Sequence, residues 1–354
     1  MVKYLMKGNE ALCEGAIRAG CRAYFGYPIT PQNEVCEYMA RRMHEVNGIF
    51  LQTESEIATV NMLLGANAAG VRAMTSSSSP GISLMQEGIS YMAGSETPAV
   101  IVNIMRGSPG LGNIAPAQGD YFQATKGGGN GDYWEVVYGP SSVQELTLYT
   151  YKAFDVAVKY RNPVIILADG VLGQMMEPVD FDIMPEIPLT TPEWATIGMR
   201  GRKTPNIINS IYLQPEALEE RCLHNQAKMM KAHDEVLEYE EYMLDGADIV
   251  IVAYGVCARV GRSVTQSLRS KGIKVGMLRP ITLWPFPEMQ LRNLAREKND
   301  RHFLVLELSG GQMLEDVRLG VQDDVKVHFY GRMGGVLITR EEVSEQVNSI
   351  LKRR

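Results

Sequence analysis

The feature of this sequence that most constrains its fold is a regular alternation between apolar stretches of strand length and longer stretches with helical periodicity. In the first half, the alternation predicts strands at 23–26, 49–52, 71–75, 99–105 and 163–168, and helices at 9–19, 31–46, 54–69, 81–93 and 142–159. Strands that alternate with helices favour βαβ units, in which neighbouring strands run parallel. The sequence therefore predicts an α/β fold with a doubly wound sheet.

A second series of such units follows an interruption. The stretch 178–213 is rich in proline and lacks a clean period, and the charged stretch 215–245 predicts one long exposed helix. The alternation then resumes, with strands expected at 248–253, 275–278, 303–308 and 325–330 and helices at 258–270, 287–297, 312–320 and 340–351. We therefore expect three parts: a large domain at 1–177, a linker and long helix at 178–245, and a smaller α/β domain at 246–354.

Charge and composition argue against several classes of protein. The net charge of −6 does not favour binding to nucleic acid or to anionic membranes. The first residues lack the apolar core of a signal peptide, and the longest apolar runs are too short to span a bilayer. We therefore expect a cytoplasmic protein that binds neither nucleic acid nor membrane.

The cysteines and histidines do not predict a metal centre in this chain. They form no CxxC or HxxxH pattern, and they are scattered at 13, 21, 36, 222 and 257 for cysteine and at 44, 224, 233, 302 and 328 for histidine. Such cysteines are more often small buried apolar side chains than ligands of a cluster.

Polar residues of interest follow three of the predicted strands, where parallel α/β sheets bind ligands. Thr30 precedes Pro31 and is a candidate N-cap whose helix could bind an anion, or a plain helix start. Thr53 and Glu56 match a T-x-x-E capping box, so Glu56 either caps a helix or contacts a cofactor. Arg106 either clamps a carboxylate or phosphate or is a surface arginine.

Three glycine-rich stretches, 107–113, 126–131 and 255–261, do not predict a phosphate-binding loop. The first two do not lie between a strand and a helix in the G-x-G-x-x-G register, and the third lacks the middle glycine. A nucleotide- or NAD-dependent enzyme that acts alone is therefore the weaker alternative.

A set of motifs resembles the pyrimidine-binding domain of 2-oxoacid:ferredoxin oxidoreductases: GYPITPQNE, TSSSSPGISLMQEGISYMAG, TPAVIVNIMRG, KGGGNGDY and YRNPVIILADGVLGQM. Later segments are similar to that family's smaller, transketolase-C-terminal-like domain: VAYGVCARV, VGMLRPITLWPFP and GRMGG. The resemblance covers essentially the whole chain. The motifs look most like the 2-oxoisovalerate (branched-chain) subgroup, with the 2-oxoglutarate subgroup close behind.

The resemblance implies a role in the oxidative decarboxylation of a 2-oxoacid to acyl-CoA and CO₂, with electrons passed to ferredoxin. Thr30 and Arg106 would hold the substrate carboxylate. Glu56 would form a hydrogen bond with the aminopyrimidine ring of thiamine diphosphate, next to Pro28 and Ile29. A non-catalytic assembly subunit with the same fold is the alternative.

The family's diphosphate and Mg²⁺ motif, GDG followed by a downstream Asn, is missing, because Tyr121 follows Asp120 and Ala168 precedes Asp169. The resemblance therefore implies a hetero-oligomer that is active only when assembled. Thiamine diphosphate would be shared with a smaller, Mg²⁺-binding subunit. Iron–sulfur clusters would belong to further partner subunits, including a CoA-side and a cluster-bearing subunit, and ferredoxin, CoA and the 2-oxoacid would bind to the complex.

Overall fold

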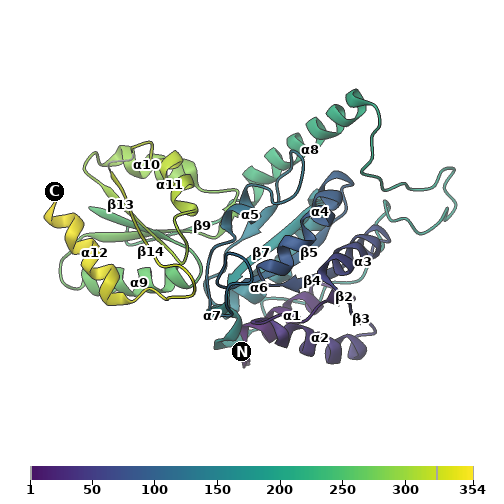
Figure 1. Cartoon of the computed structure of the whole chain (residues 1–354), viewed down its shortest axis with the longest axis horizontal. Coiled ribbons are helices and arrows are strands. Elements are labelled where there is room, and N and C mark those ends of the chain that lie inside the picture. The colour runs from purple at the N-terminus through teal and green to yellow at the C-terminus, as the bar shows by residue number, and fades with distance from the viewer. Residues whose placement is uncertain (1, 324–325, 354) are drawn as a thin grey trace.

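The computed structural model describes residues 2–323 and 326–353, and two sheets lie side by side in it, one built mainly from each half of the chain (Figure 1). The first is a seven-stranded sheet of order β12-β6-β7-β5-β4-β2-β3, and the second is five-stranded, of order β14-β13-β10-β11-β9. Helices cover both faces of each sheet. The predicted α/β, doubly wound fold class is therefore confirmed.

The first sheet is parallel except for β12, which runs antiparallel to β6. Its strands are β2 (Ala23–Gly26), β3 (Ile49–Gln52), β4 (Ala73–Ser77), β5 (Ala99–Met105), β6 (Val136–Tyr138), β7 (Pro163–Asp169) and β12 (Thr282–Trp284). The accompanying helices are α1 (Gly8–Arg18), α2 (Asn33–Glu45), α3 (Glu56–Ala68), α4 (Pro80–Gly94), α5 (Tyr121–Thr125), α6 (Val143–Tyr160) and α7 (Gly170–Gln174).

The fully apolar sequence of β5 follows from its central place in this sheet. Val100 and Val102 pack into the core that contains residues of α1, α2 and α6, whereas Ile101 packs into the core that contains residues of α3 and α4. Successive side chains of a strand point to opposite faces, so a strand covered on both faces needs apolar residues at nearly every position.

The second sheet repeats this arrangement on a smaller scale, with α10 and α11 on one face and α9 and α12 on the other. Its strands are β9 (Tyr239–Tyr242), β10 (Ile249–Ala253), β11 (Val275–Pro280), β13 (His302–Glu307) and β14 (Val327–Gly331). Its helices are α9 (Gly255–Arg269), α10 (Glu288–Glu297), α11 (Met313–Val321) and α12 (Arg340–Lys352). A separate antiparallel pair joins β1 (Lys3–Lys7) to β8 (Met176–Asp180).

Two expectations about the second half need correction. The helix predicted over 215–245 is wrong, because α8 (Pro215–Val236) ends early and the chain turns back as β9, which pairs antiparallel with β11. Glu240 of β9 accepts hydrogen bonds from Arg262 and Arg279, which fixes this edge strand. The strand expected at 325–330 begins instead at Val327, as β14, and position 325 lies outside the described residues.

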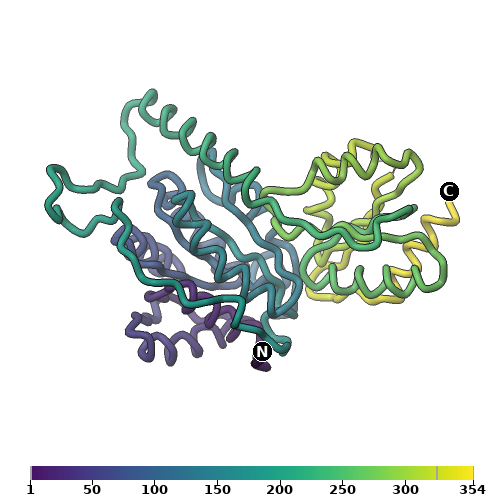
Figure 2. Tube along the Cα trace, turned by 180° about the vertical axis from the view of Figure 1, so that it is seen from behind, coloured from purple at the N-terminus to yellow at the C-terminus, as the bar shows by residue number. Residues whose placement is uncertain are grey.

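The predicted domain boundaries stay predictions. β12 belongs by sequence to the last part of the chain, yet it pairs with β6 in the first sheet. The linker after β8 runs along the outside of the molecule to the far end of α8, as Figure 2 shows from behind. Most of its side chains are exposed, and so are those of the first turns of α8.

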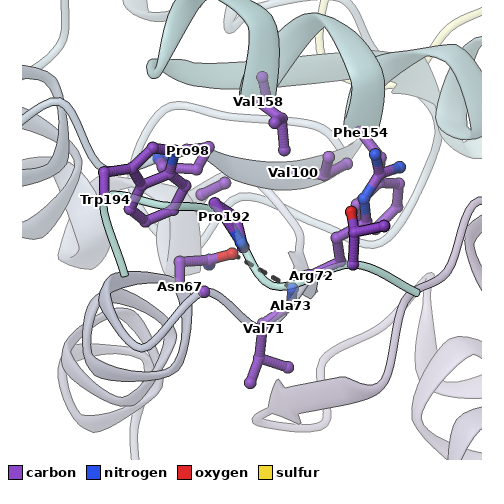
Figure 3. A pocket seen from close by; sticks show the side chains of 14 residues that line it. Asn67, Val71, Arg72, Ala73, Pro98, Val100, Phe154, Val158, Pro192 and Trp194 are labelled. Atoms are coloured by element: carbon purple, nitrogen blue, oxygen red, sulfur yellow. Dashed lines mark hydrogen bonds between the residues drawn. The ribbon is translucent and has the colours of Figure 1, made fainter. Parts of the chain in front are cut away.

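Part of this linker covers the amino-terminal edge of the first sheet and closes a small pocket there (Figure 3). Pro192 and Trp194 of the linker face residues at the starts of β4 and β5, and the Arg161 guanidinium lies over the Trp194 ring. The Asn67 carboxamide accepts a hydrogen bond of 3.2 Å from the backbone N–H of Ala73. This pocket lies at the opposite edge of the sheet from the predicted ligand-binding ends of the strands.

Candidate functional site

The residues singled out in the sequence gather at the carboxyl ends of β2, β4 and β5, which are neighbours in the sheet. Arg106 directly follows β5, and its Nη1 donates a hydrogen bond of 3.0 Å to the carbonyl oxygen of Thr30, in the loop after β2. Glu56 opens α3, and its Oε1 accepts a hydrogen bond of 3.3 Å from Ser77, the last residue of β4. Thr30, Glu56 and Arg106 therefore all lie on the side of the sheet where its parallel strands end.

Thr30 does not cap a helix, so that expectation is wrong. The backbone N–H of Gln32 bonds to the carbonyl of Ile29, and this turn delays the start of α2 until Asn33. The Thr30 hydroxyl instead accepts a hydrogen bond of 3.2 Å from the Asn33 side chain. In the same loop, Pro28 is exposed and Ile29 is half-buried.

The predicted capping box at Thr53 and Glu56 is also wrong. Ser55 is the N-cap of α3, and its hydroxyl accepts from the backbone N–H of Ala58 at 3.3 Å. The Thr53 hydroxyl instead bonds to that of Thr59, at 2.5 Å. Glu56 therefore has no capping role to explain its position.

Glu56 is buried, with 5% of its surface exposed, whereas its neighbour Glu54 is exposed. A Cβ atom at Gly81 would lie 2.3 Å from Glu56 Oε1, so any larger residue at this position would clash with the Glu56 carboxylate. A buried carboxylate costs free energy unless hydrogen bonds or opposite charges compensate. A ligand that donates a hydrogen bond would supply that compensation.

Arg106 is not a surface arginine, because only 9% of it is exposed. Its Nη2 donates to the carbonyl of Leu111 at 3.2 Å, but its buried Nε has no hydrogen-bond partner among the described residues. Within residues 2–323 and 326–353, the guanidinium forms no ion pair. A buried cation without a counter-charge is costly, and a ligand carboxylate fits its planar fork of donors.

The same edge holds further buried polar atoms that no described residue satisfies. They are Gln32 Nε2, Asn33 Oδ1, Thr75 Oγ1 and Ser78 Oγ. Sequence reasoning missed all four, although the run of serines after Thr75 at the end of a strand was a usable signal. Because most buried polar groups are hydrogen-bonded, atoms left without a partner in β4 and in the segments after β2 and β4 are available to a polar ligand.

Asp120 and Asp169, the aspartates of the two incomplete GDG motifs, also lie near these strand ends. Asp169 caps α7 and accepts a hydrogen bond of 2.8 Å from the backbone N–H of Val256, where α9 begins. Burial raises the pKa of Asp169 to about 6. Burial also raises the pKa of Asp120, which accepts hydrogen bonds from Ser79 and Asn103.

The chain shows neither a metal-ligand cluster nor a membrane-spanning helix in its described part. Among the described residues, no three His, Cys, Asp or Glu side chains are grouped as metal ligands would be. In the same part of the chain, every helix is too short or too polar to cross a membrane.

Comparisons with known proteins identify the family to which the chain is similar. Residues 14–243 match the family model for pyruvate flavodoxin/ferredoxin oxidoreductase, thiamine diphosphate-binding, and residues 247–343 match that for pyruvate:ferredoxin oxidoreductase core domain II. The ketoisovalerate oxidoreductase subunit VorB of Methanothermobacter thermautotrophicus is 49% identical over 99% of this chain and 98% of its own length. The 2-oxoglutarate synthase subunit KorA of Methanocaldococcus jannaschii is 36% identical over 97% of this chain and 98% of its own length.

A solved structure is similar as well. The 2-oxoglutarate:ferredoxin oxidoreductase from Magnetococcus marinus, with 2-oxoglutarate, coenzyme A and succinyl-CoA bound, matches with a TM-score of 0.85 and 27% sequence identity. The match covers 99% of this chain but spans only 65% of the solved chain.

Proposed function

Because the chain belongs to the pyruvate flavodoxin/ferredoxin oxidoreductase family, whose first domain binds thiamine diphosphate, we propose that it is the pyrimidine-binding subunit of a branched-chain 2-oxoacid:ferredoxin oxidoreductase. The complete enzyme would convert the 2-oxoacid and CoA to acyl-CoA and CO₂ and pass electrons to ferredoxin. The identity of 49% to a ketoisovalerate oxidoreductase subunit, against 36% to a 2-oxoglutarate synthase subunit, supports the branched-chain substrate.

The proposal rests on one observation, the buried and incompletely paired guanidinium of Arg106. Its guanidinium is buried, one of its nitrogens has no partner, and no described carboxylate pairs with it. A 2-oxoacid supplies the missing carboxylate, which Arg106 would bind with two parallel hydrogen bonds. Thr30, whose backbone Arg106 already contacts, would add its hydroxyl to the same carboxylate.

Glu56 would serve the cofactor. Thiamine diphosphate, when bound, supplies the electron sink that makes decarboxylation of a 2-oxoacid feasible. Glu56 would hold a proton at a nitrogen of the aminopyrimidine ring, since its carboxylate is buried and, among the described residues, accepts a hydrogen bond from Ser77 alone. Pro28 and Ile29 would contact the ring from the loop after β2.

The second carboxylate of 2-oxoglutarate would need another cation near the pocket. The loop after Arg106 offers Lys126, and its ammonium is already paired with the buried carboxylate of Asp316. This engagement of Lys126 supports a small branched 2-oxoacid over 2-oxoglutarate.

The rest of the active site would come from other chains. The relatives named above are called subunits, and the diphosphate and Mg²⁺ motif of the family is missing from this sequence. We therefore place the diphosphate and Mg²⁺ on a smaller partner subunit, and the iron–sulfur clusters on partner subunits that accept the electrons for ferredoxin.

A panel of 2-oxoacids tested with the complete complex, CoA and ferredoxin decides the substrate. We expect kcat/KM for 2-oxoisovalerate to exceed that for 2-oxoglutarate, and the reverse order would assign the 2-oxoglutarate activity instead. Activity that ignores substitution of Thr30, Glu56 and Arg106 would identify a non-catalytic assembly subunit.

Calorimetry tests the shared cofactor site. The isolated chain should bind thiamine diphosphate poorly even with Mg²⁺, because most of the ligand's charge lies on its diphosphate. Adding the smaller subunit should produce tight binding. Low-micromolar binding to the isolated chain would show that the chain holds the whole site by itself.

A further inference from the structure

Asp120 lies beneath the candidate site in a position that its own helix does not explain. Only 9% of it is exposed, and although it occupies the N-cap position of α5, its side chain makes no capping hydrogen bond. Its Oδ2 instead accepts hydrogen bonds from the Ser79 hydroxyl at 2.6 Å and from the Asn103 side chain at 2.9 Å. The carboxylate therefore points back to the sheet.

These three residues form one cluster, here called the Asp120 cluster (Asp120, Ser79 and Asn103), that ties the end of β4 to the end of β5. Asn103 belongs to β5, and its Oδ1 accepts a hydrogen bond of 3.2 Å from the backbone N–H of Ser79. Ser79 lies between β4 and α4. Asp120 thus holds both side chains that join the two strands.

The cluster is connected both to Arg106 and to Glu56, the two charged residues of the candidate site. The backbone N–H of Arg106 donates a hydrogen bond of 3.1 Å to the Ser79 hydroxyl, whose own proton goes to Asp120. On the other side, Ser79 follows Ser77 and Ser78 along the chain, and Ser77 is the hydrogen-bond partner of Glu56. The cluster is therefore hydrogen-bonded directly to the backbone of Arg106, whereas Glu56 is connected to it only along the chain, through Ser77.

We propose that Asp120 is a positioning residue for the reaction: through Ser79 and Asn103, its carboxylate fixes where Arg106 presents its guanidinium to the substrate. The inference rests on the proposed function, and within it Asp120 touches neither substrate nor cofactor. A carboxylate suits this role because hydrogen bonds to a charged acceptor are shorter and stronger than those to a neutral one. Catalytic geometry needs such support, since a displacement of about 1 Å can cost about 10²-fold in rate.

The test is the variant Asp120→Asn in the complete complex, with kcat and KM measured for the preferred 2-oxoacid. We expect kcat/KM to fall about 10-fold or more, mainly through a higher KM. The matched control is Asp180→Asn, because Asp180 is also 9% exposed and its Oδ1 accepts a hydrogen bond from the backbone N–H of Asp182, away from the site. The control should keep its kinetics.

A double-mutant cycle separates positioning from a merely structural effect. If Asp120 acts through Arg106, then Asp120→Asn combined with Arg106→Ala should lose no more activity than Arg106→Ala alone. Losses that multiply, or an Asp120→Asn variant with unchanged kinetics, would overturn the inference. If Asp120→Asn does not fold, Ser79→Ala breaks the same link and enters the same cycle.

The outcome also distinguishes this inference from the proposed function. Activity of the complex that ignores substitution of Thr30, Glu56 and Arg106 alike would defeat the proposed function. A large loss in Arg106→Ala, together with an independent effect of Asp120→Asn, would defeat only the positioning role.

Discussion

Each sheet places a buried glutamate near the carboxyl ends of its strands, and the two have very different surroundings. In the second sheet, the fully buried Glu307 ends β13 and accepts four hydrogen bonds at 2.8–3.1 Å from the serine hydroxyl and backbone N–H groups of the following turn, at Ser309, Gln312, Met313 and Leu314. In the first sheet, Glu56 has one hydrogen bond among the described residues, of 3.3 Å, from Ser77. The chain itself supplies hydrogen bonds to the Glu307 carboxylate, whereas most of the hydrogen-bonding capacity of the Glu56 carboxylate is left for a ligand.

The buried arginines differ in the same way. Arg279, 4% exposed, donates two hydrogen bonds to Glu145 and one to Glu240, at 2.7–2.9 Å. Arg106 donates only to two carbonyl oxygens and forms no ion pair among the described residues. Because buried charges are stable only when paired, the second sheet is built for support and the first for a ligand that arrives from outside.

The comparison is tested most strongly by replacing the two glutamates. Glu56→Gln should lower kcat of the complete complex by at least about 10²-fold, since the amide cannot hold the proton at the ring nitrogen. The melting temperature should change little, because Ser55 and not Glu56 caps α3. Glu307→Gln should do the opposite, lowering the melting temperature while the activity per folded molecule stays high.

Two neighbours of Glu56 serve as controls. Ser55→Ala should cost about 1 kcal/mol of stability through the lost cap, with little effect on kcat. Glu54→Gln, at an exposed position, should leave both unchanged. A larger loss of activity in Glu54→Gln than in Glu56→Gln would move the cofactor contact to Glu54.

Replacing the arginines should give the next largest effect. Arg106→Ala should reduce kcat/KM about 10- to 150-fold, because a hydrogen bond to a charged group is worth about 1.5–3 kcal/mol. Assembly of the complex should persist. Arg279→Ala should instead destabilise the chain on the order of 3 kcal/mol, since it leaves Glu145 without an ion-pair partner among the described residues and Glu240 with Arg262 alone. Near-normal kinetics of Arg106→Ala would remove Arg106 from the site.

Glu135 is a third buried glutamate, and it lies away from the candidate site. Its replacement should have the smallest effect on activity. Both of its oxygens are buried without a partner among the described residues, yet it precedes β6, at the amino-terminal edge of the sheet. Burial raises its pKa from 4.5 to about 8, so at neutral pH it holds a proton and needs no counter-charge. The unpaired oxygens of Glu135 therefore do not mark a site for a cationic ligand at the amino-terminal ends of the strands.

A raised folded-state pKa makes stability depend on pH in a defined direction. The unfolded chain releases the Glu135 proton above its ordinary pKa, so the free energy of unfolding should fall as pH rises from about 4.5 to about 8. Denaturant titrations of the wild type should therefore show a loss of a few kcal/mol over this range, which Glu135→Gln should lack. Equal pH slopes for the two proteins would mean that Glu135 is ionised when folded.

Local pattern was sufficient to predict the central parallel strands, because a strand covered on both faces must be largely apolar, as β5 is. It was not sufficient for β6 and β12, which are three residues long each and pair across 144 positions, from Tyr138 to Thr282. No local signal distinguishes such pairs. The end of α8 was missed for a similar reason, since β9 forms only because β11 offers an edge.

The site was predictable in part. A strand-end rule directed attention to Thr30, Glu56 and Arg106, and the fold does gather them at one edge. Both predicted helix caps were displaced by two residues, because turns and hydroxyl pairs compete for the same side chains. The Asp120 cluster was out of reach, because hydrogen bonds between residues 17 to 41 positions apart leave no periodic trace.

The crossing of β12 into the first sheet bears on how this chain can be cut for expression. A truncated chain that stops before β12 would strip β6 of its outer neighbour and leave Val137 and Tyr138, both buried in the intact chain, beside an open row of backbone donors and acceptors. Exposed apolar edges of this kind recruit strands from other molecules and promote aggregation. The truncation would also separate Trp284 from Trp134, whose rings stack 5.9 Å apart. The first half should therefore be produced with β12 supplied, either on the same chain or as an added peptide.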